Sequence, residues 1–269
     1  FGEIKLNSDG SKEEEVLPLL LSVRSGAAVS MPGMMETILN LGLNDQLVEA
    51  MANISSNRGW ALDCYRRFLQ MFGTVVLGMK NYLYEDILNK TCARRGLVDV
   101  SLLEEGDLQD VISQFKDLAP VPDDPWEQLE LAIESVFRSW YSSEAEKYRD
   151  IHNIPDDLGT AVVVQAMVYG NRNTNSGSGV ASTHNPLTGA KELYGEYLPN
   201  AEGEEVLSGL RTPLKLSSLE EIMPSIHQSL LQYEKVLTNH YRDMQDIEFT
   251  VENGELFILE TRRGKRSAR

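Results

Sequence analysis

The spacing of apolar and polar positions changes several times along the chain. Residues 18–23 (PLLLSV) form a short apolar run, which predicts a buried strand. A loop rich in Gly, Ala, Ser and Met follows, and we predict a helix that begins near Gly33. From about Gly59 to Asp150 apolar residues recur at i, i+3, i+4 and i+7, which indicates a block of helices. Within it, Asp124 as an N-cap and Pro125 in the first turn mark the start of one helix.

The pattern changes after Pro155. GTAVVVQAMVYG (159–170) is β-branched and strand-like, NRNTNSGSG (171–179) is typical of a turn, and VASTH (180–184) and KELYGEYLPN (191–200) predict further strands around an NPLTG turn. A helix over 217–244 and a terminal hairpin complete the chain. Because hairpins link these strands, the pattern favours an α+β fold.

This order suggests a division of the chain into three parts. We expect residues 1–45 to form the first part of one domain, with a strand, a loop and a helix. Residues 46–154 would form a helical subdomain inserted into it, and residues 155–269 would complete the domain with a β-meander, a helix and the hairpin.

The terminal hairpin, DMQDIEFTVENGELFILETRRGKR (243–266), carries acidic residues on both arms. We predict a three-residue loop, Glu252 to Gly254, and reject a two-residue Asn-Gly turn because it would mix the faces. The expected register gives one core face, formed by Ile247, Phe249, Val251, Phe257 and Leu259.

The other face of the hairpin would then gather charged side chains at its open end. Glu260 is expected opposite Asp246, diagonal to Glu248 and two residues from Arg262. Carboxylates this close raise one another's pKa unless a positive group neutralises them. Oxygen ligands suit Mg²⁺, which usually arrives with substrate phosphates. A solvated sheet face, with Arg262 as a surface ion-pair partner, is the alternative.

Two other stretches are candidates for contacts with phosphate. The glycine-rich turn that includes Ser176, Gly177, Ser178 and Gly179 could cradle phosphate with backbone N–H groups, or it could be a plain turn. Arg24 leaves a buried strand beside a glycine-rich loop, which suits either bidentate phosphate binding or a structural ion pair.

Charge and cysteine content limit the binding partners and the cellular setting that we expect for this protein. The 269 residues include 25 Lys and Arg against 41 Asp and Glu, a formal net charge of −16, and this charge disfavours nucleic acid and anionic membranes as partners. Cys64 and Cys92 match no metal-ligand spacing, which favours a reducing, intracellular setting and not a secreted protein. We find no apolar run near the roughly 20 residues of a membrane span, and no signal peptide. The start at Phe1, without Met, suggests a piece of something longer.

Several stretches together resemble the pyruvate phosphate dikinase family. They are SVRSGAAVSMPGMMETILNLGLND, GTAVVVQAMVYGN, SGSGVAS, NPLTG, LYGEYLPNAEGEEVLSGLRTP and MQDIEFTVENGELFILETRRGKR, in that order. The resemblance implies an ATP-grasp-type nucleotide-binding domain with a helical insert. In this family ATP phosphorylates a histidine on a separate swivelling domain, which serves a distant pyruvate and phosphoenolpyruvate site.

The resemblance also implies roles for particular residues. Arg24 and Arg262 would bind phosphates and act in catalysis, and Asp246, Glu248 and Glu260 would hold Mg²⁺. The backbone at Gln165, Met167 and Val168 would meet the adenine. The remaining contacts to ATP would come from Ser176, Gly177, Ser178, Gly179, Glu204 and Asp246.

The chain departs from the family's pattern at three positions. Glu260 and Glu202 stand where the family usually has Gln, and His184 stands where it has Arg. The family's glycine-lysine segment and phosphohistidine motif are absent from this sequence.

The alternative functions are those of phosphoenolpyruvate synthase or a related dikinase, or of a non-catalytic nucleotide-binding regulator. The resemblance implies a full-length homodimer in the cytoplasm or in an organelle such as a plastid or a glycosome-like compartment.

Overall fold

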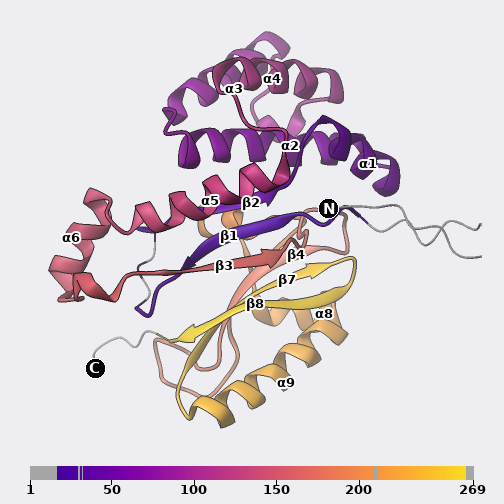
Figure 1. Cartoon of the computed structure of the whole chain (residues 1–269). Coiled ribbons are helices and arrows are strands. Elements are labelled where there is room, and N and C mark those ends of the chain that lie inside the picture. The colour runs from indigo at the N-terminus through magenta and orange to yellow at the C-terminus, as the bar shows by residue number, and fades with distance from the viewer. Residues whose placement is uncertain (1–16, 30, 32, 209–210, 265–269) are drawn as a thin grey trace, which may run out of the picture. The chain divides into compact units, whose positions relative to one another are not determined.

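The chain folds into two compact units, which we describe separately. The computed structural model describes residues 17–29, 31, 33–208 and 211–264, except the side chains of residues 204, 207 and 208. Unit 1 is Phe1–Met167 and unit 2 is Val168–Arg269. Both contain antiparallel sheets together with helices, so the fold is α+β, as predicted (Figure 1). The three-part division expected from the sequence remains a prediction.

Unit 1 is built on a small sheet with strand order β2-β1-β3. Its strands are β1 (Leu21–Gly26), β2 (Thr37–Leu41) and β3 (Ala161–Ala166), all antiparallel. Strands were predicted for β1 and β3, and both are confirmed. The helix predicted near Gly33 is wrong, because the residues that follow it form β2.

The pairing of β2 with β1 explains that error. In β2 the buried Ile38 lies opposite the buried Val23, inside the sheet. A five-residue segment with apolar residues at three positions, as in TILNL, fits either helical or strand spacing, and tertiary pairing decides between them. The next helix begins only at Asp45, after Asn44, whose side chain accepts a hydrogen bond from the Leu47 amide.

The rest of unit 1 is mainly helical, as the periodicity predicted. Asp124 caps the helix at Pro125 by accepting from the Trp126 amide, which confirms that part of the prediction. Short 3-10 turns cover Val100–Leu102 and Asp156–Leu158. The longer elements are α1 (Asp45–Ser55), α2 (Arg58–Met71), a π-helical segment (Phe72–Val76), α3 (Asn81–Arg95), α4 (Glu105–Leu118), α5 (Pro125–Ser139) and α6 (Ser143–His152).

A buried glutamine ties α5 to two loops of unit 1. Gln128 is fully buried, and its Oε1 accepts from the Gly42 amide at 2.8 Å. Its Nε2 donates to the carbonyls of Leu43 at 3.0 Å and Pro122 at 2.7 Å. Loss of this side chain would leave two buried backbone groups and one part-buried carbonyl without these bonds, and each buried group left unpaired costs about 1–3 kcal/mol.

We therefore expect Gln128→Ala to lower the free energy of unfolding of unit 1 by about 3 kcal/mol. The three tryptophans, Trp60, Trp126 and Trp140, all belong to unit 1, so their fluorescence during urea unfolding measures this change. Gln114→Ala is the control, because Gln114 is exposed and donates to a carbonyl of its own helix. An equal decrease in the free energy of unfolding in both variants would contradict the structural role proposed for the Gln128 hydrogen bonds.

Unit 2 is built on a five-stranded antiparallel sheet of order β6-β5-β4-β7-β8. The strands are β4 (Gly177–Ser182), β5 (Tyr194–Pro199), β6 (Leu214–Lys215), β7 (Gln245–Glu252) and β8 (Glu255–Arg263). Its helices are α7 (Gly203–Ser208), α8 (Leu219–Ile222) and α9 (Pro224–Tyr241). The helix predicted over 217–244 is thus two helices, separated at Met223 by the proline that starts α9.

Helices α8 and α9 cover one face of this sheet (Figure 1). The shared core consists of Ala181, Tyr197, Leu216, Leu219, Ile226, Leu230, Ile247, Phe249 and Val251. We call this side the helix-covered face. The opposite side of β4, β7 and β8 carries the residues that alternate with these, and it is the side of interest for function.

The glycine-rich segment belongs to the centre of this sheet and is not a turn. Gly177, Ser178 and Gly179 lie in β4, between β5 and β7, so the predicted turn is wrong at these positions. The physical reason is close packing. A Cβ on Gly177 would lie 2.2 Å from the Tyr197 hydroxyl, and one on Gly179 would lie 2.4 Å from Cζ of Phe249. The two rings stack with centroids 6.3 Å apart.

The hairpin of β7 and β8 has a two-residue turn, so the predicted three-residue loop is wrong. Asn253 and Gly254 both have positive φ, 50° and 83°, as the tight Asn-Gly turn requires. Near the turn, Phe249 lies opposite Ile258 and Val251 opposite Leu256. Leu256 and Ile258 therefore pack on the helix-covered face, in place of the predicted Phe257 and Leu259.

A bulge then changes the register along the rest of the hairpin. Glu248 pairs with Glu260 while Phe249 pairs with Ile258, so β8 contains one extra residue, Leu259, at this point. The bulge reverses the parity of β8. Beyond it, the charged residues at the open end lie on the face opposite the helix-covered one, as predicted.

Candidate functional site

The open end of the hairpin brings together four charged side chains, which we call the acidic face: Asp246, Glu248, Glu260 and Arg262. Glu248 pairs in register with Glu260, and Asp246 with Arg262. The predicted pairing of Glu260 with Asp246 is therefore wrong. The membership of the cluster is nevertheless as predicted, because strand alternation places all four on the same side.

Arg262 is the electrostatic centre of the acidic face. Its Nε donates to one carboxylate oxygen of Glu260, and its second guanidinium nitrogen donates to the other oxygen at 2.9 Å. The same nitrogen lies 3.1 Å from a carboxylate oxygen of Glu248. The bond with Glu260 raises the pKa of Arg262 although burial lowers it, and the charges of Glu248 and Asp246 raise it further. Arg262 is thus held as a cation between carboxylates.

Asp246 is oriented by a residue that was not predicted to take part. The Ser182 hydroxyl donates to its Oδ1 at 2.7 Å, and the two residues face each other across β4 and β7. Sequence reasoning missed Ser182, since its role depends on the register between strands that are about 60 residues apart. The sequence signal that could have indicated Ser182 is its spacing of two and four residues from Val180 and Ser178. These residues lie on the same side of β4, opposite the helix-covered face.

A second network fastens the tip of the hairpin within unit 2. Glu252 accepts from the Tyr169 amide at 3.0 Å and from the Arg172 guanidinium at 2.6 Å. The Asn253 amide donates to the hydroxyl of Ser176 at 3.0 Å, so Ser176 has a structural role at the turn. This network fixes the end of β7 distant from the acidic face.

The predicted residues of unit 1 lie on its sheet. Arg24 in β1 donates to Oε1 of Gln165 in β3 at 3.0 Å. The Met167 amide donates to the Leu20 carbonyl at 2.9 Å, so it extends the pairing of β1 with β3. Val168 is the first residue of unit 2. Adenine binding along this edge strand and phosphate binding by Arg24 remain predictions.

The other predicted positions lie in unit 2, around β4 and α7. Ser178 is buried and hydrogen-bonds with Thr250 at 3.1 Å. Gly177 and Gly179 pair with both neighbouring strands, and phosphate binding by these residues remains a prediction. Glu204 is in α7, but its side chain lies outside the described residues.

Two positions that depart from the family pattern are also in unit 2. Glu202 is buried and accepts a hydrogen bond from the Asn171 amide group at 3.1 Å. His184 follows β4, and its Nδ1 hydrogen-bonds with the Thr183 hydroxyl at 3.0 Å. Neither residue belongs to the acidic face as we define it.

The chemistry of the acidic face suits a divalent cation. Three carboxylates against one guanidinium leave two negative charges, and carboxylate oxygens are the ligands that Mg²⁺ prefers. Yet among residues 17–264, apart from the undescribed positions, no group of three or more acidic, His or Cys side chains is placed to hold a metal ion. At the acidic face, Arg262 bonds to Glu260 and lies 3.1 Å from a carboxylate oxygen of Glu248.

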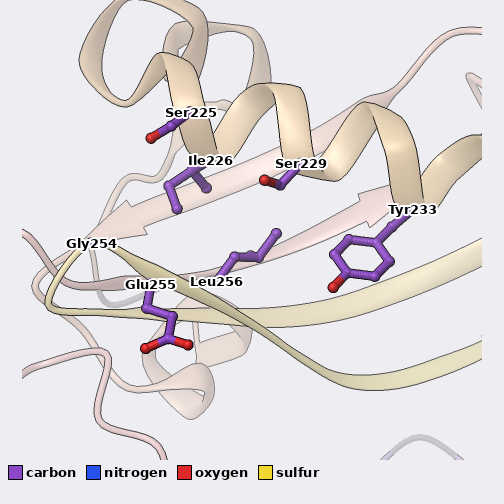
Figure 2. A pocket seen from close by; sticks show the side chains of 7 residues that line it. All are labelled: Ser225, Ile226, Ser229, Tyr233, Gly254, Glu255 and Leu256. Atoms are coloured by element: carbon purple, nitrogen blue, oxygen red, sulfur yellow. The ribbon is translucent and has the colours of Figure 1, made fainter.

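Unit 2 also has a pocket of about 320 Å³ on its other side. Figure 2 shows it between α9 and the hairpin tip, where Ile226 and Leu256 point toward each other. It is lined by Ser225, Ile226, Ser229, Tyr233, Gly254, Glu255 and Leu256. None of these was a predicted site residue, and none belongs to the acidic face.

In the part of the chain that the structure describes, no helix is long and apolar enough to cross a membrane.

Comparison with known proteins gives consistent matches. Residues 3–219 match the family model described as "Pyruvate phosphate dikinase, AMP/ATP-binding domain". The chain is 49% identical over 258 residues to pyruvate, phosphate dikinase 2 of Zea mays, which covers 94% of this chain and 29% of that protein. It is 49% identical over 273 residues to pyruvate, phosphate dikinase of Rhizobium meliloti (strain 1021), with 94% and 30% covered. The chain therefore spans less than a third of the length of these relatives.

Proposed function

Because the chain belongs to the family of the pyruvate phosphate dikinase AMP/ATP-binding domain, we propose that it binds ATP with Mg²⁺ in an ATP-grasp-type domain. The observation that carries the proposal is the acidic face, where carboxylates and an arginine meet on one side of an antiparallel sheet. Phosphoryl transfer depends mainly on positioning and charge neutralisation. Arg262 and a cation held by the carboxylates would supply both.

Each residue of the acidic face has a proposed role. Glu248, Glu260 and Asp246 would hold Mg²⁺, which when bound neutralises phosphate charge. The guanidinium of Arg262 would bind a phosphate oxygen, and the hydroxyl of Ser182 would keep Asp246 oriented. On the family resemblance alone, Arg24 is proposed to contact phosphate, and the backbone at Gln165, Met167 and Val168 to contact adenine.

In the longer protein, we propose that ATP bound here phosphorylates a histidine on a separate swivelling domain. The complete reaction would convert pyruvate, ATP and phosphate into phosphoenolpyruvate, AMP and diphosphate. The length of the relatives, more than three times the matched segment, supports the need for further domains. We expect the reaction to take place in the cytoplasm or in a plastid, in a full-length homodimer.

The test combines this chain with a histidine-bearing domain supplied in trans. We expect Mg²⁺ and ATP labelled at the β-phosphate to give label on the histidine, measured as acid-labile protein-bound phosphate. A Glu255→Gln variant should label as the wild type does, because Glu255 is exposed and is not part of the acidic face. Absence of label would overturn phosphoryl transfer.

One observation favours a second function, a non-catalytic nucleotide-binding regulator. Arg262 is already paired with Glu260, so the group proposed to bind phosphate is occupied by a carboxylate. ATP binding without any labelled histidine would support this second function. Absence of both binding and label would overturn nucleotide binding altogether.

A further inference from the structure

The tip of the β7–β8 hairpin carries the single Asn-Gly pair of the sequence, Asn253 and Gly254. Both residues are exposed to solvent, and Gly254 marks the tip in Figure 2. An asparagine followed by glycine is especially prone to deamidation, because glycine has no Cβ to keep its backbone nitrogen away from the asparagine side chain. Every other asparagine in the sequence is followed by a residue with a side chain. The sequence therefore singles out Asn253 for this reaction.

The reaction needs only the chain and water. The backbone nitrogen of Gly254 loses its proton and forms a bond to Cγ of Asn253, which closes a succinimide ring. The bond from Cγ to Nδ2 breaks, and the side-chain nitrogen leaves as ammonia with that proton. Water then opens the ring at either carbonyl, and the product is aspartate or isoaspartate.

The fold holds both reacting groups in other hydrogen bonds. The amide nitrogen of Gly254, which would attack, donates to the Asn175 carbonyl at 2.8 Å. Oδ1 of Asn253 accepts from Nδ2 of Asn173 at 3.1 Å, and the Asn253 amide donates to the Ser176 hydroxyl at 3.0 Å. We call Asn173, Asn175 and Ser176 the tip clamp. The nitrogen must lose its bond to the clamp, and the side chain must turn, before the two can react.

Asn173 organises the tip clamp. Its Oδ1 accepts from the Asn175 amide at 2.9 Å and from the Ser176 hydroxyl at 3.0 Å, as in an Asx-turn. Since its oxygen is used within the loop, its Nδ2 is the group that faces Asn253. Ser176 is fully buried, which anchors the clamp in unit 2. One side chain thus shapes the loop and also holds the amide that would react.

We propose that Asn253 is a deamidation site that the tip clamp keeps unreactive in the folded protein. Modification then requires local opening of the tip, so its rate reports how often the clamp opens. The proposal does not depend on nucleotide binding. In isoaspartate the main chain runs through the side-chain carbon and is longer by one atom, so the turn no longer fits its hydrogen bonds. The product also adds a negative charge between Glu252 and Glu255, which repel it.

The first test compares the folded and the unfolded wild type, residues 1 to 269, at mildly alkaline pH. Digestion and mass spectrometry measure conversion of the peptide that contains Asn253, by the mass difference between water and ammonia. We expect conversion in the folded protein to be at least about 10-fold slower than in urea. Equal rates in the two conditions would overturn the proposal. This comparison needs no variant, so it decides the proposal even where a variant fails to fold.

The second test uses Asn173→Asp, which keeps the oxygen that shapes the loop but lacks the donor to Asn253. We expect the folded variant to convert about 10-fold faster than the folded wild type, with equal rates in urea. Asn185→Ala is the matched control, because Asn185 accepts from the Leu187 and Thr188 amides in another turn of unit 2. It should convert at the wild-type rate.

Slow hydrogen exchange in peptides from β4 and β7 identifies variants in which unit 2 stays folded. A folded Asn173→Asp that converts no faster than the wild type would overturn the role of the clamp. Acceleration in Asn185→Ala equal to that in Asn173→Asp would also overturn it, since any loosened turn would then have the same effect.

Discussion

Replacing Gly179 with alanine is expected to destabilise unit 2 by about 3 kcal/mol or more. A Cβ at this position would lie 2.4 Å from Cζ of Phe249 and 2.7 Å from the Glu196 carbonyl oxygen. Phe249 is 1% exposed and stacks on Tyr197, so its ring has little room to move. The carbonyl belongs to the neighbouring strand β5, and moving it would disturb the sheet.

Hydrogen exchange of peptides from β4 and β7 would measure this loss. Exchange is appropriate because the tryptophans are all in unit 1 and do not report on unit 2. Gly203→Ala is the matched control in the same unit, since a Cβ on Gly203 would have no atom within 4 Å. Exchange in Gly179→Ala as slow as in this control would show that the rings do not require a glycine there.

Replacing Glu248 with glutamine is expected to weaken ATP binding in the presence of Mg²⁺ by about 100-fold, which corresponds to roughly 2.7 kcal/mol. Glu248 stands at the centre of the acidic face, opposite Glu260 in register and 3.1 Å from Arg262. The amide keeps the size of the side chain but removes the negative charge that a divalent cation needs.

Calorimetric titration with ATP at saturating Mg²⁺ measures the effect of Glu248→Gln. Glu255→Gln serves again as the control, because it removes one carboxylate from the same hairpin without changing the acidic face. The two variants have equal net charge, so long-range electrostatics cannot explain a difference between them. Equal affinities would mean that Glu248 does not contribute to the cation site.

The acidic face was predictable from sequence although the details of the hairpin were not. Glu260 and Arg262 are two residues apart, as are Asp246 and Glu248, and strand alternation alone places each pair on one face. Pairing between the arms was mispredicted, because Leu256 to Leu259 are four consecutive apolar residues. Such a run has no alternation, so it cannot show which side faces the core.

The spacing of the glycines in β4 could have been used to predict a strand there in place of a turn. Gly177 and Gly179 are two residues apart, a spacing that places both on one side of a strand. Their number and their serine neighbours suggested a turn, whereas the structure requires them as space for Tyr197 and Phe249. That requirement depends on aromatic residues from two distant segments, so no local pattern reveals it.

The bulge at Leu259 determines how this hairpin tolerates insertions and deletions. Loss of one residue from β8 between the turn and Glu260 would remove the extra residue and give the arms a regular register throughout. Glu260 and Arg262 would then stay opposite Glu248 and Asp246, and residues paired across a hairpin share one face. A single-residue deletion here would thus preserve the site, as would paired insertions, one on each arm near the turn. Loss of Thr261 would instead place Glu260 and Arg262 on opposite faces of the sheet.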